Sequence, residues 1–444
     1  MQKDKAMKKS TISFSLRVFR RYMFFLSSQR WSKEKIEQYQ DRRLRDIVRH
    51  AAEHVPYYRN LFKGIGFDPN KFRGREDMRK IPMLDKQTLR IRQDEFIADN
   101  ASRYGISWDS TSGSTGTPLH FIEDNLTKAS KLAVVLRSYQ WAGYSPGKKT
   151  FSLQSYTFGD PASFSKYFPF VRLRRFDAKK LKKDTAMELI DLIDRERPGI
   201  LIGYPFSIFM LTQFAEREGR SIHPVESIVT AGETLSEKRR GLLETAYGCR
   251  VYDFFSHHEN VAVITECENQ TRHICEDFAY NEIVDESGKD ASEQGTGELV
   301  GTGFYNYAMP LIRYRIGDKV VLDKRNDVCG CGRHFRIIKE ITGRQNDYLE
   351  TPDGRLLGNV LEHSVDNAKG VVLSQCVQDA IDHIYVNLIV EKEFSEVSKM
   401  ELEKGLRKRL GTEIKIDFRV VSELERSRSG KTPFIISKIG HEYI

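Results

Sequence analysis

Residues 111–118 read Thr111-Ser112-Gly113-Ser114-Thr115-Gly116-Thr117-Pro118, and no other stretch says as much about the fold. Five of its eight side chains carry a hydroxyl group and two are glycines. A loop of this composition can turn tightly and surround an anion with backbone N–H groups and hydroxyl donors. It is not the P-loop of kinases and GTPases, because the Gly-Lys-Ser/Thr ending is missing. By itself the stretch fits a phosphate-binding loop and an ordinary surface loop equally well.

The composition is that of a soluble globular protein. The 444 residues suffice for two or three domains, with 39% hydrophobic and 30% charged residues. No run approaches about 18 consecutive apolar residues, so no transmembrane helix is expected. The apolar block Met23-Phe24-Phe25-Leu26 is too short for a secretory signal. We therefore expect a cytoplasmic protein.

The charge pattern limits the classes of binding partner that are expected. The net charge is +9, but Lys and Arg are spread along the chain, so no nucleic-acid partner is expected. The segment 8–30 mixes basic with large apolar residues, which allows peripheral contact with a membrane. The alternative for this segment is a helix packed on the main domain or a mobile tail.

Strand and helix patterns alternate after the opening stretch. Helices are expected at 126–141 and 181–195, and strands at 150–153, 200–202, 227–230 and 250–255. This order predicts an α/β core with a largely parallel sheet, in which ligands bind where strands end in loops.

The chain after residue 280 has a different texture. Residues 281–323 read as β-strands with Gly-rich turns. Further strands are expected at 371–378, 383–391 and 413–420, with a helix at 395–410. We predict a large N-terminal domain, 1–344, with an α/β core and a β-subdomain. A small mobile α+β domain, 345–444, follows a hinge near Gln345-Asn346-Asp347.

Further motifs follow in a fixed order, and together they carry a resemblance. They are residues 55–59, 111–118, Ala231-Gly232-Glu233, 252–259, 297–300, 309–318, Gly343-Arg344 and Gly430-Lys431. With them the chain resembles the phenylacetate–CoA ligase branch of the adenylate-forming superfamily. Within that branch it is similar to the CapK-type proteins, which are encoded with capsule and surface-polysaccharide genes. Each motif taken singly also has an ordinary structural explanation.

The resemblance implies an AMP-forming ligase that uses ATP and Mg²⁺ to turn a carboxylic acid into an acyl-adenylate. Residues 111–118 would hold the β- and γ-phosphates. Glu259 matches the glutamate that helps to place Mg²⁺, and Asp318 matches the aspartate that accepts both ribose hydroxyls. Arg344 matches an arginine near the ribose and the hinge. The resemblance further places Ala231, Gly232 and Glu233 along the adenine pocket.

Lys431 matches the lysine that reaches from the small domain toward the attacking carboxylate and the α-phosphate, where fixed cations stabilise converging negative charge. The sequence departs from the family at Ser256-His257-His258-Glu259, where a glycine-led turn is usual. His257 or His258 therefore either shapes the pocket or joins the acid–base chemistry, and we count His258 among the catalytic candidates.

The motifs define the acyl acceptor and the carboxylic acid less well than the nucleotide site. Coenzyme A is the default acceptor from the resemblance, but residues 348–354 lack the family's Arg-Gly-x-Asn run. An amine, carried on a sugar in surface-polysaccharide assembly, is the alternative, and a catalytically degenerate AMP-binding scaffold is another. Five aromatic residues near strand ends would border an acyl pocket or belong to the core: Tyr204, Phe206, Tyr252, Phe254 and Phe255.

The cysteines suggest a metal site. Cys329 and Cys331 form a Cys-Gly-Cys pair, and Cys267 and His273 lie six residues apart upstream. Thiolates and an imidazole in two pairs are typical of tetrahedral structural zinc. We predict zinc ligands at Cys267, His273, Cys329 and Cys331, with Cys275 as a substitute, against the alternative of four reduced cysteines close by chance.

Overall fold

The computed structural model describes most of the chain. The described residues are 2–110, 119–160, 162–285, 287–291, 295–323, 329–344, 349–352, 356–357, 368–426 and 432–439. The opening stretch 111–118, Lys431 and the hinge residues 345–347 lie outside them. Arg344 is described by its backbone alone.

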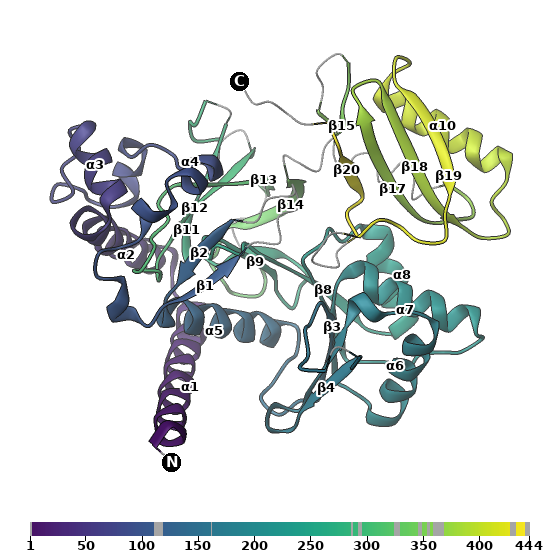
Figure 1. The fold of residues 1–444 in the computed structure, drawn as a ribbon, viewed down its shortest axis with the longest axis horizontal. Helices are drawn as coiled ribbons and strands as arrows, with labels where there is room; N and C mark the ends of the chain where they lie inside the picture. The colour runs from purple at the N-terminus through teal and green to yellow at the C-terminus, as the bar shows by residue number, and fades with distance from the viewer. Residues whose placement is uncertain are drawn as a thin grey trace.

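The N-terminal hundred residues are largely helical. They form α1 (Gln2–Ser28), α2 (Lys33–His54), α3 (Pro56–Gly64) and α4 (Lys86–Ile91), with short 3₁₀ turns after α3. Ser32 caps α2 by accepting a hydrogen bond from Lys35 N, and Asp85 caps α4 in the same way. The N-terminal part of α1 projects from the body, and its C-terminal part contacts α5 (Asn125–Trp141) (Figure 1).

One twelve-stranded sheet runs through the large part of the molecule. Its spatial order is β11-β12-β13-β14-β10-β9-β8-β7-β6-β3-β5-β4. The parallel section is β3 (Thr150–Gln154), β5 (Leu173–Asp177), β6 (Ile200–Gly203), β7 (Ser227–Ala231) and β8 (Arg250–Ser256). Strand β4 (Ser165–Phe168) closes this end of the sheet in antiparallel fashion. The expected α/β core is therefore present. Strands β3, β6, β7 and β8 lie at the predicted places, whereas β4 and β5 were not predicted.

The antiparallel section continues the same sheet. It consists of β9 (Val263–Glu266), β10 (Arg272–Ile274), β11 (Ala279–Val284), β12 (Thr296–Gly303), β13 (Tyr314–Leu322) and β14 (Ile337–Arg344). Strand β9 pairs antiparallel with β8, which joins the two sections. The sequence pattern indicated strands only within residues 281–323, where β12 and β13 lie. It indicated neither β9, β10 and β14 nor the continuation of the parallel sheet.

Helices cover both faces of the parallel section. Alternate residues of the strands point to opposite faces, so Ile200 and Ile202 pack in one core cluster and Leu201 in another. The first cluster contains Ala133 and Val134 of α5. The second contains side chains of α6 (Lys183–Glu196), α7 (Pro205–Arg217) and α8 (Glu237–Tyr247). A sheet buried on both faces explains the nearly continuous apolar runs of these strands.

Among its described residues, the small C-terminal part contains a four-stranded sheet that packs against α10 (Glu396–Leu410) (Figure 1). The strand order is β19 (Lys415–Val420), β18 (His383–Val390), β17 (Val371–Ala380) and β20 (Ile435–Ser437). Leu402, Leu406 and Leu410 of α10 recur every four residues and share a buried cluster with β18. This agrees with the expected α+β pattern. The predicted boundary itself stays a prediction, because it lies outside the described residues.

Candidate functional site

The carboxyl ends of β7 and β8 place two predicted motifs at the same edge of the sheet. The two strands are parallel neighbours, with Ala231 opposite Phe254. Ala231-Gly232-Glu233 therefore follows β7 beside the segment that follows β8, which contains His257, His258 and Glu259. Gly232 adopts a positive φ of 83°, which a residue with a side chain rarely tolerates. Ligands in open α/β sheets bind at this edge.

Glu259 is buried and ionised at this edge. It is 4% exposed, and its carboxylate accepts a hydrogen bond from Tyr314 Oη at 3.2 Å. His257 Nδ1 lies 2.9 Å from Glu259 Oε2. Burial alone would raise the pKa of Glu259, but the adjacent His257 outweighs it and the pKa falls to about 2. His257 thus supports the carboxylate from within the protein, in line with the pocket-shaping alternative.

His258 points elsewhere. Its Nε2 lies 3.3 Å from Asp109 Oδ2, and its side chain is 46% exposed. Asp109 belongs to β1 (Ser107–Ser110), which pairs antiparallel with β2 (His120–Glu123). This hairpin flanks residues 111–118 on both sides. Asn260 donates from Nδ2 to Glu123 Oε1 at 2.5 Å, so both strands of the hairpin are tied to the turn that carries Glu259.

Asp318 and Arg344 meet in the antiparallel section. Their residues are paired across β13 and β14. Asp318 is 3% exposed, and it lies on the same face of β13 as Tyr314, the residue that contacts Glu259. Gly317, just before Asp318, has a positive φ of 83°, so the strand is irregular where the carboxylate is presented. Strand pairing thus brings Asp318 and Arg344 together, while Tyr314 links β13 to Glu259.

Glu233 makes a contact that the sequence did not indicate. Its Oε2 accepts a hydrogen bond from Phe206 N in the first turn of α7, and its Oε1 accepts one from Thr432 N of the small part, both at 3.0 Å. Thr432 follows Lys431 directly. The motifs Ala231-Gly232-Glu233 and Gly430-Lys431 marked the two segments in the sequence but not the contact between them.

The predicted acyl-pocket aromatics divide between two places. Tyr204 and Phe206 belong to the core cluster with α7, whereas Tyr252 and Phe254 belong to the cluster with α5. Phe254 contacts Tyr139 edge-on, with ring centroids 5.9 Å apart, as expected of a core residue. Tyr252 lines a cavity of about 530 Å³ together with Trp141 and Arg333, near the start of β8 rather than its end. Tyr252 therefore does not border the edge that carries Glu233 and Glu259.

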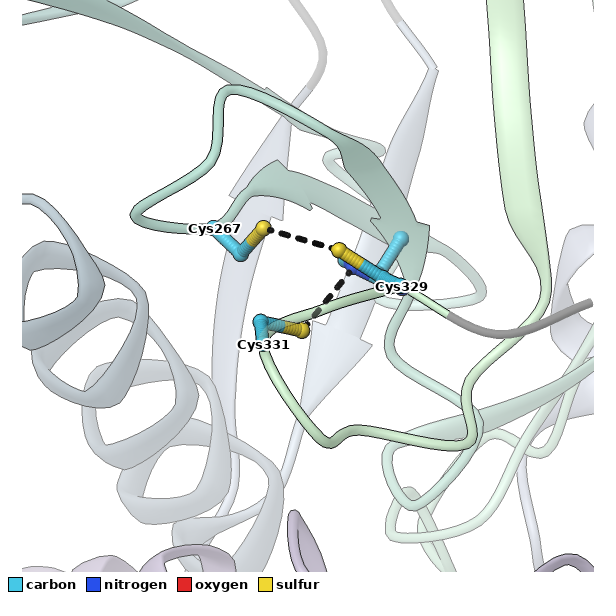
Figure 2. A group of neighbouring side chains, drawn as sticks. Cys267, Cys329 and Cys331 are labelled. Carbon is cyan, nitrogen blue, oxygen red and sulfur yellow. Dashed lines mark hydrogen bonds between the residues drawn. The ribbon is translucent and has the colours of Figure 1, made fainter. Parts of the chain in front are cut away.

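The four predicted metal ligands converge. Cys267 follows β9, His273 lies on β10, and Cys329 and Cys331 precede β14. Their ligand atoms all lie within 4.8 Å of one another and all four residues are buried. Figure 2 shows the three cysteine sulfurs directed toward one another. Cys275 lies outside this group, with its side chain against Arg137.

The spacing within this cluster suits a tetrahedral ion. Cys267 Sγ lies 3.7 Å from Cys329 Sγ, and Cys331 Sγ lies 3.5 Å from His273 Nε2. Zinc at about 2.3 Å from sulfur and about 2.05 Å from nitrogen would separate such pairs by about 3.8 Å and about 3.5 Å. The other ring nitrogen, His273 Nδ1, lies 3.1 Å from Phe335 O, which can fix the ring with Nε2 toward the sulfurs.

Comparisons with known proteins agree with the resemblance. Residues 349–438 match the family model of the CapK C-terminal domain. A phenylacetate-coenzyme A ligase of Thermus thermophilus is 28% identical over 326 residues, which is 71% of this chain and 72% of that protein. Protein CapK of Staphylococcus aureus is 25% identical over 415 residues, or 90% of this chain and 89% of that protein.

A solved 2-hydroxyisobutyryl-CoA ligase has the same fold in both its parts. In its postadenylation state with 2-HIB-AMP the TM-score is 0.76 at 18% identity, over 93% of this chain and 91% of that one. In its thioesterification state with 2-HIB-AMP and CoA the TM-score is 0.60 at 19% identity, over 92% and 91%. The two parts of this chain are therefore arranged more like those of the first state.

Proposed function

We propose that this chain, a member of the phenylacetate–CoA ligase and CapK branch of the adenylate-forming enzymes, activates a carboxylic acid with ATP and passes the acyl group to an acceptor. Membership of this branch makes it an AMP-forming ligase. The observation that carries the proposal is the edge formed by β7 and β8. There a buried, ionised Glu259 stands between the hairpin that flanks residues 111–118 and the strand that bears Asp318.

The reaction joins two anions. A carboxylate oxygen bonds to the α-phosphorus of ATP, the bond from that phosphorus to the β-phosphate oxygen breaks, and pyrophosphate leaves. Residues 111–118 would hold the β- and γ-phosphates by backbone and hydroxyl donors. Asp318 would accept the ribose hydroxyls with Arg344 alongside, and Ala231-Gly232-Glu233 would border the adenine. Lys431 would neutralise charge as carboxylate and phosphate converge.

The chemistry of Glu259 suits Mg²⁺, because that ion prefers carboxylate oxygen and bridges phosphate oxygens. Bound there, the ion would supply positive charge to the phosphates. His258 is exposed and pairs with Asp109 near the start of residues 111–118. Its imidazole would therefore contact a bound phosphate rather than the carboxylate of Glu259.

There are two candidates for the acyl acceptor. Coenzyme A is supported by the phenylacetate-coenzyme A ligase relatives, and it is our first candidate. An amine acceptor, on a sugar of a surface polysaccharide, is favoured by one specific observation. The small part matches the CapK C-terminal domain, and the CapK alignment covers 90% of the chain against 71% for the ligase. The small domain would face the acceptor, so its similarity to the CapK C-terminal domain is relevant to whether the acceptor is coenzyme A or an amine.

We further propose that the cysteine and histidine cluster holds a structural zinc ion. Three thiolates and one imidazole would fill a tetrahedral site and leave no open position for catalysis. The cluster lies against the junction of α1 and α2, because Arg30 Nη1 donates to Cys331 O at 2.8 Å and His334 Nδ1 lies 3.0 Å from Trp31 O. The ion would therefore fasten the N-terminal helices to the antiparallel section.

Helix α1 offers a face for an anionic lipid surface. Leu16, Phe19 and Met23 recur at helical spacing on one face and are 51%, 59% and 49% exposed. Arg17 and Arg20 flank them, and the preceding turns carry further lysines. Apolar side chains bordered by basic ones match the interface of an anionic membrane. In the part of the chain that the structure describes, no helix has the length and apolar character to cross a membrane.

Carboxylate-dependent exchange of labelled pyrophosphate into ATP tests the proposal. A panel of aliphatic, aromatic and amino-substituted acids should reveal at least one acid that supports exchange. The active acid would then be offered with coenzyme A and with amino sugars, to see which one consumes the acyl-adenylate. A folded protein that exchanges no pyrophosphate with any acid would favour the scaffold alternative.

A further inference from the structure

One buried side chain of the small sheet binds the described residues on either side of residues 427–431. Gln375 of β17 is fully buried. Its Oε1 accepts a hydrogen bond from Glu425 N at 3.0 Å, and its Nε2 donates to Glu425 O at 2.9 Å and to Pro433 O at 3.0 Å. Glu425 precedes residues 427–431 and Pro433 follows them. The amide of Gln375 therefore joins Glu425 and Pro433 within the small sheet.

Thr432 of the small part is bound to the large part by Glu233. One oxygen of Glu233 accepts from Phe206 N at the start of α7, where the helix dipole favours a negative charge. The other oxygen accepts from Thr432 N, the residue next to Lys431. A carboxylate fixed at one oxygen presents the other in a defined direction, and hydrogen bonds to a charged acceptor are the stronger kind.

Other contacts between the two parts are broader. Leu373, Ile389 and Leu424 of the small part belong to the core cluster of α6, α7 and α8, and Arg426 Nη1 donates to Ala178 O at 3.2 Å. These contacts hold the small part against the helices. Among the described contacts, the one from Glu233 lies nearest in sequence to Lys431 and acts on the backbone that carries it.

The geometry assigns the side chain of Glu233 a role as the positioning residue that docks Thr432, the neighbour of Lys431, in the adenylate-forming arrangement, while the backbone of residues 231–233 would border the adenine. This inference rests on the proposed function. Gln375 holds Glu425 and Pro433 together within the small domain, and Glu233 would bind Thr432 only when the domains are arranged as here. For acyl transfer the small domain would rotate, Thr432 would leave Glu233, and Lys431 would no longer be needed.

Docking by the Glu233 side chain and contact of that side chain with adenine would change different kinetic constants. An adenine contact binds ATP equally before and during the reaction, so its loss raises the KM for ATP. A docking residue acts when Lys431 must meet the α-phosphate, so its loss lowers the kcat of adenylation. A residue that served only as an N-terminal cap of α7 would change stability and leave both kinetic constants in place.

The test compares Glu233→Ala and Glu233→Gln with the wild type in the two half-reactions. Glu233→Ala should lower the kcat of pyrophosphate exchange by about 10- to 100-fold, the range of a lost charge-assisted hydrogen bond, with little change in the KM for ATP. Acyl transfer from chemically made acyl-AMP should stay within about twofold of the wild type, because Glu233 would have no contact with Thr432 in that step. Glu233→Gln keeps one acceptor and should be intermediate.

Controls make each outcome decisive. Glu237→Ala, an exposed first-turn residue of α8, should behave as the wild type. Hydrogen exchange at the Thr432 amide should accelerate in Glu233→Ala and stay unchanged in Glu237→Ala. Equal losses in both half-reactions, a change in the KM for ATP alone, or unchanged exchange at Thr432 would overturn the inference. A wild type that exchanges no pyrophosphate with any acid overturns the proposed function itself, a result that does not depend on Glu233.

Discussion

Asp318 shows what a single buried residue is expected to do for nucleotide binding. It is 3% exposed and presented from an irregular turn of β13. Asp318→Ala should weaken ATP binding by about 1.5–3 kcal/mol, the value of a lost charge-assisted hydrogen bond. Titration calorimetry with ATP and AMP measures the loss, and Asp382→Ala, an exposed residue of the small domain, is the control. Unchanged affinity would mean that the ribose lies elsewhere.

Asp253 gives a pH prediction that does not depend on the function. Burial, followed by the charge of Glu266, raises the pKa of Asp253 from 3.8 to about 6. Because the folded pKa is the higher one, the unfolded chain ionises first as the pH rises, and the folded state loses relative stability between about pH 4 and pH 6. At about 1.4 kcal/mol per pH unit, this loss amounts to about 3 kcal/mol.

Asp253→Asn should remove that part of the pH dependence. Urea unfolding of both proteins between pH 4 and pH 7 gives the free energy of unfolding at each pH. The variant should gain on the wild type as the pH rises to about 6, after which the difference should stay constant. Curves that run parallel across this range would show that the pKa of Asp253 is the same in both states.

At the scale of elements, the cysteine cluster links three strands and the N-terminal helices. The purified protein should contain about one equivalent of zinc, and Cys331→Ser should lower metal content and melting temperature together, because metal binding contributes to folding. Cys249→Ser is the matched control, since Cys249 lies outside the cluster. A metal-free protein whose melting is unchanged by a chelator would remove the site.

Helix α1 is the other element with a testable surface. The double variant Leu16→Ser, Phe19→Ser should reduce sedimentation with phosphatidylglycerol-containing vesicles by about tenfold or more, because burial of such side chains contributes about 1.5–3 kcal/mol each. Neutral phosphatidylcholine vesicles should bind the wild type weakly. Ile91→Ser, which alters an exposed apolar residue of α4, controls for general hydrophobicity. Equal binding to both vesicles, or a dimer lost in the double variant, would contradict the membrane surface.

At the scale of the whole molecule, each half-reaction is expected to depend on how the two domains are arranged. Lys431→Ala should lower adenylate formation by about 10²–10³-fold while ATP binding stays largely intact, because the lysine meets the phosphate only when the small domain closes. Transfer from supplied acyl-AMP should survive if coenzyme A is the acceptor and the domain has rotated.

This prediction is tested by comparing the loss of each half-reaction in Lys431→Ala. Pyrophosphate exchange and thioester formation are measured on the same preparation of Lys431→Ala. Loss of both half-reactions would argue against alternation of the domains. Full retention of adenylate formation would overturn the assignment of Lys431 itself.

Local patterns in the sequence were enough for many of the elements and their order. The apolar runs at 200–202 and 227–230 and the helical period at 126–141 became β6, β7 and α5, because burial on one or two faces imposes a period that can be read residue by residue. The cysteine and histidine spacing likewise indicated the four residues that converge, because ligand types are few and distinctive. The roles of Asp318, Glu259 and Lys431 rest on the resemblance and stay predictions.

Only the tertiary structure decided which distant segments meet. The pairing of β8 with β9 makes one twelve-stranded sheet of two sections, and His258 and Asn260 tie the hairpin β1–β2 to the turn of Glu259. The contact from Glu233 to Thr432 spans 199 residues. Such contacts depend on how strands order across a sheet and how a second domain docks. Neither leaves a periodic trace in the local sequence, because the partner of each group is fixed by the packing of all the elements between them.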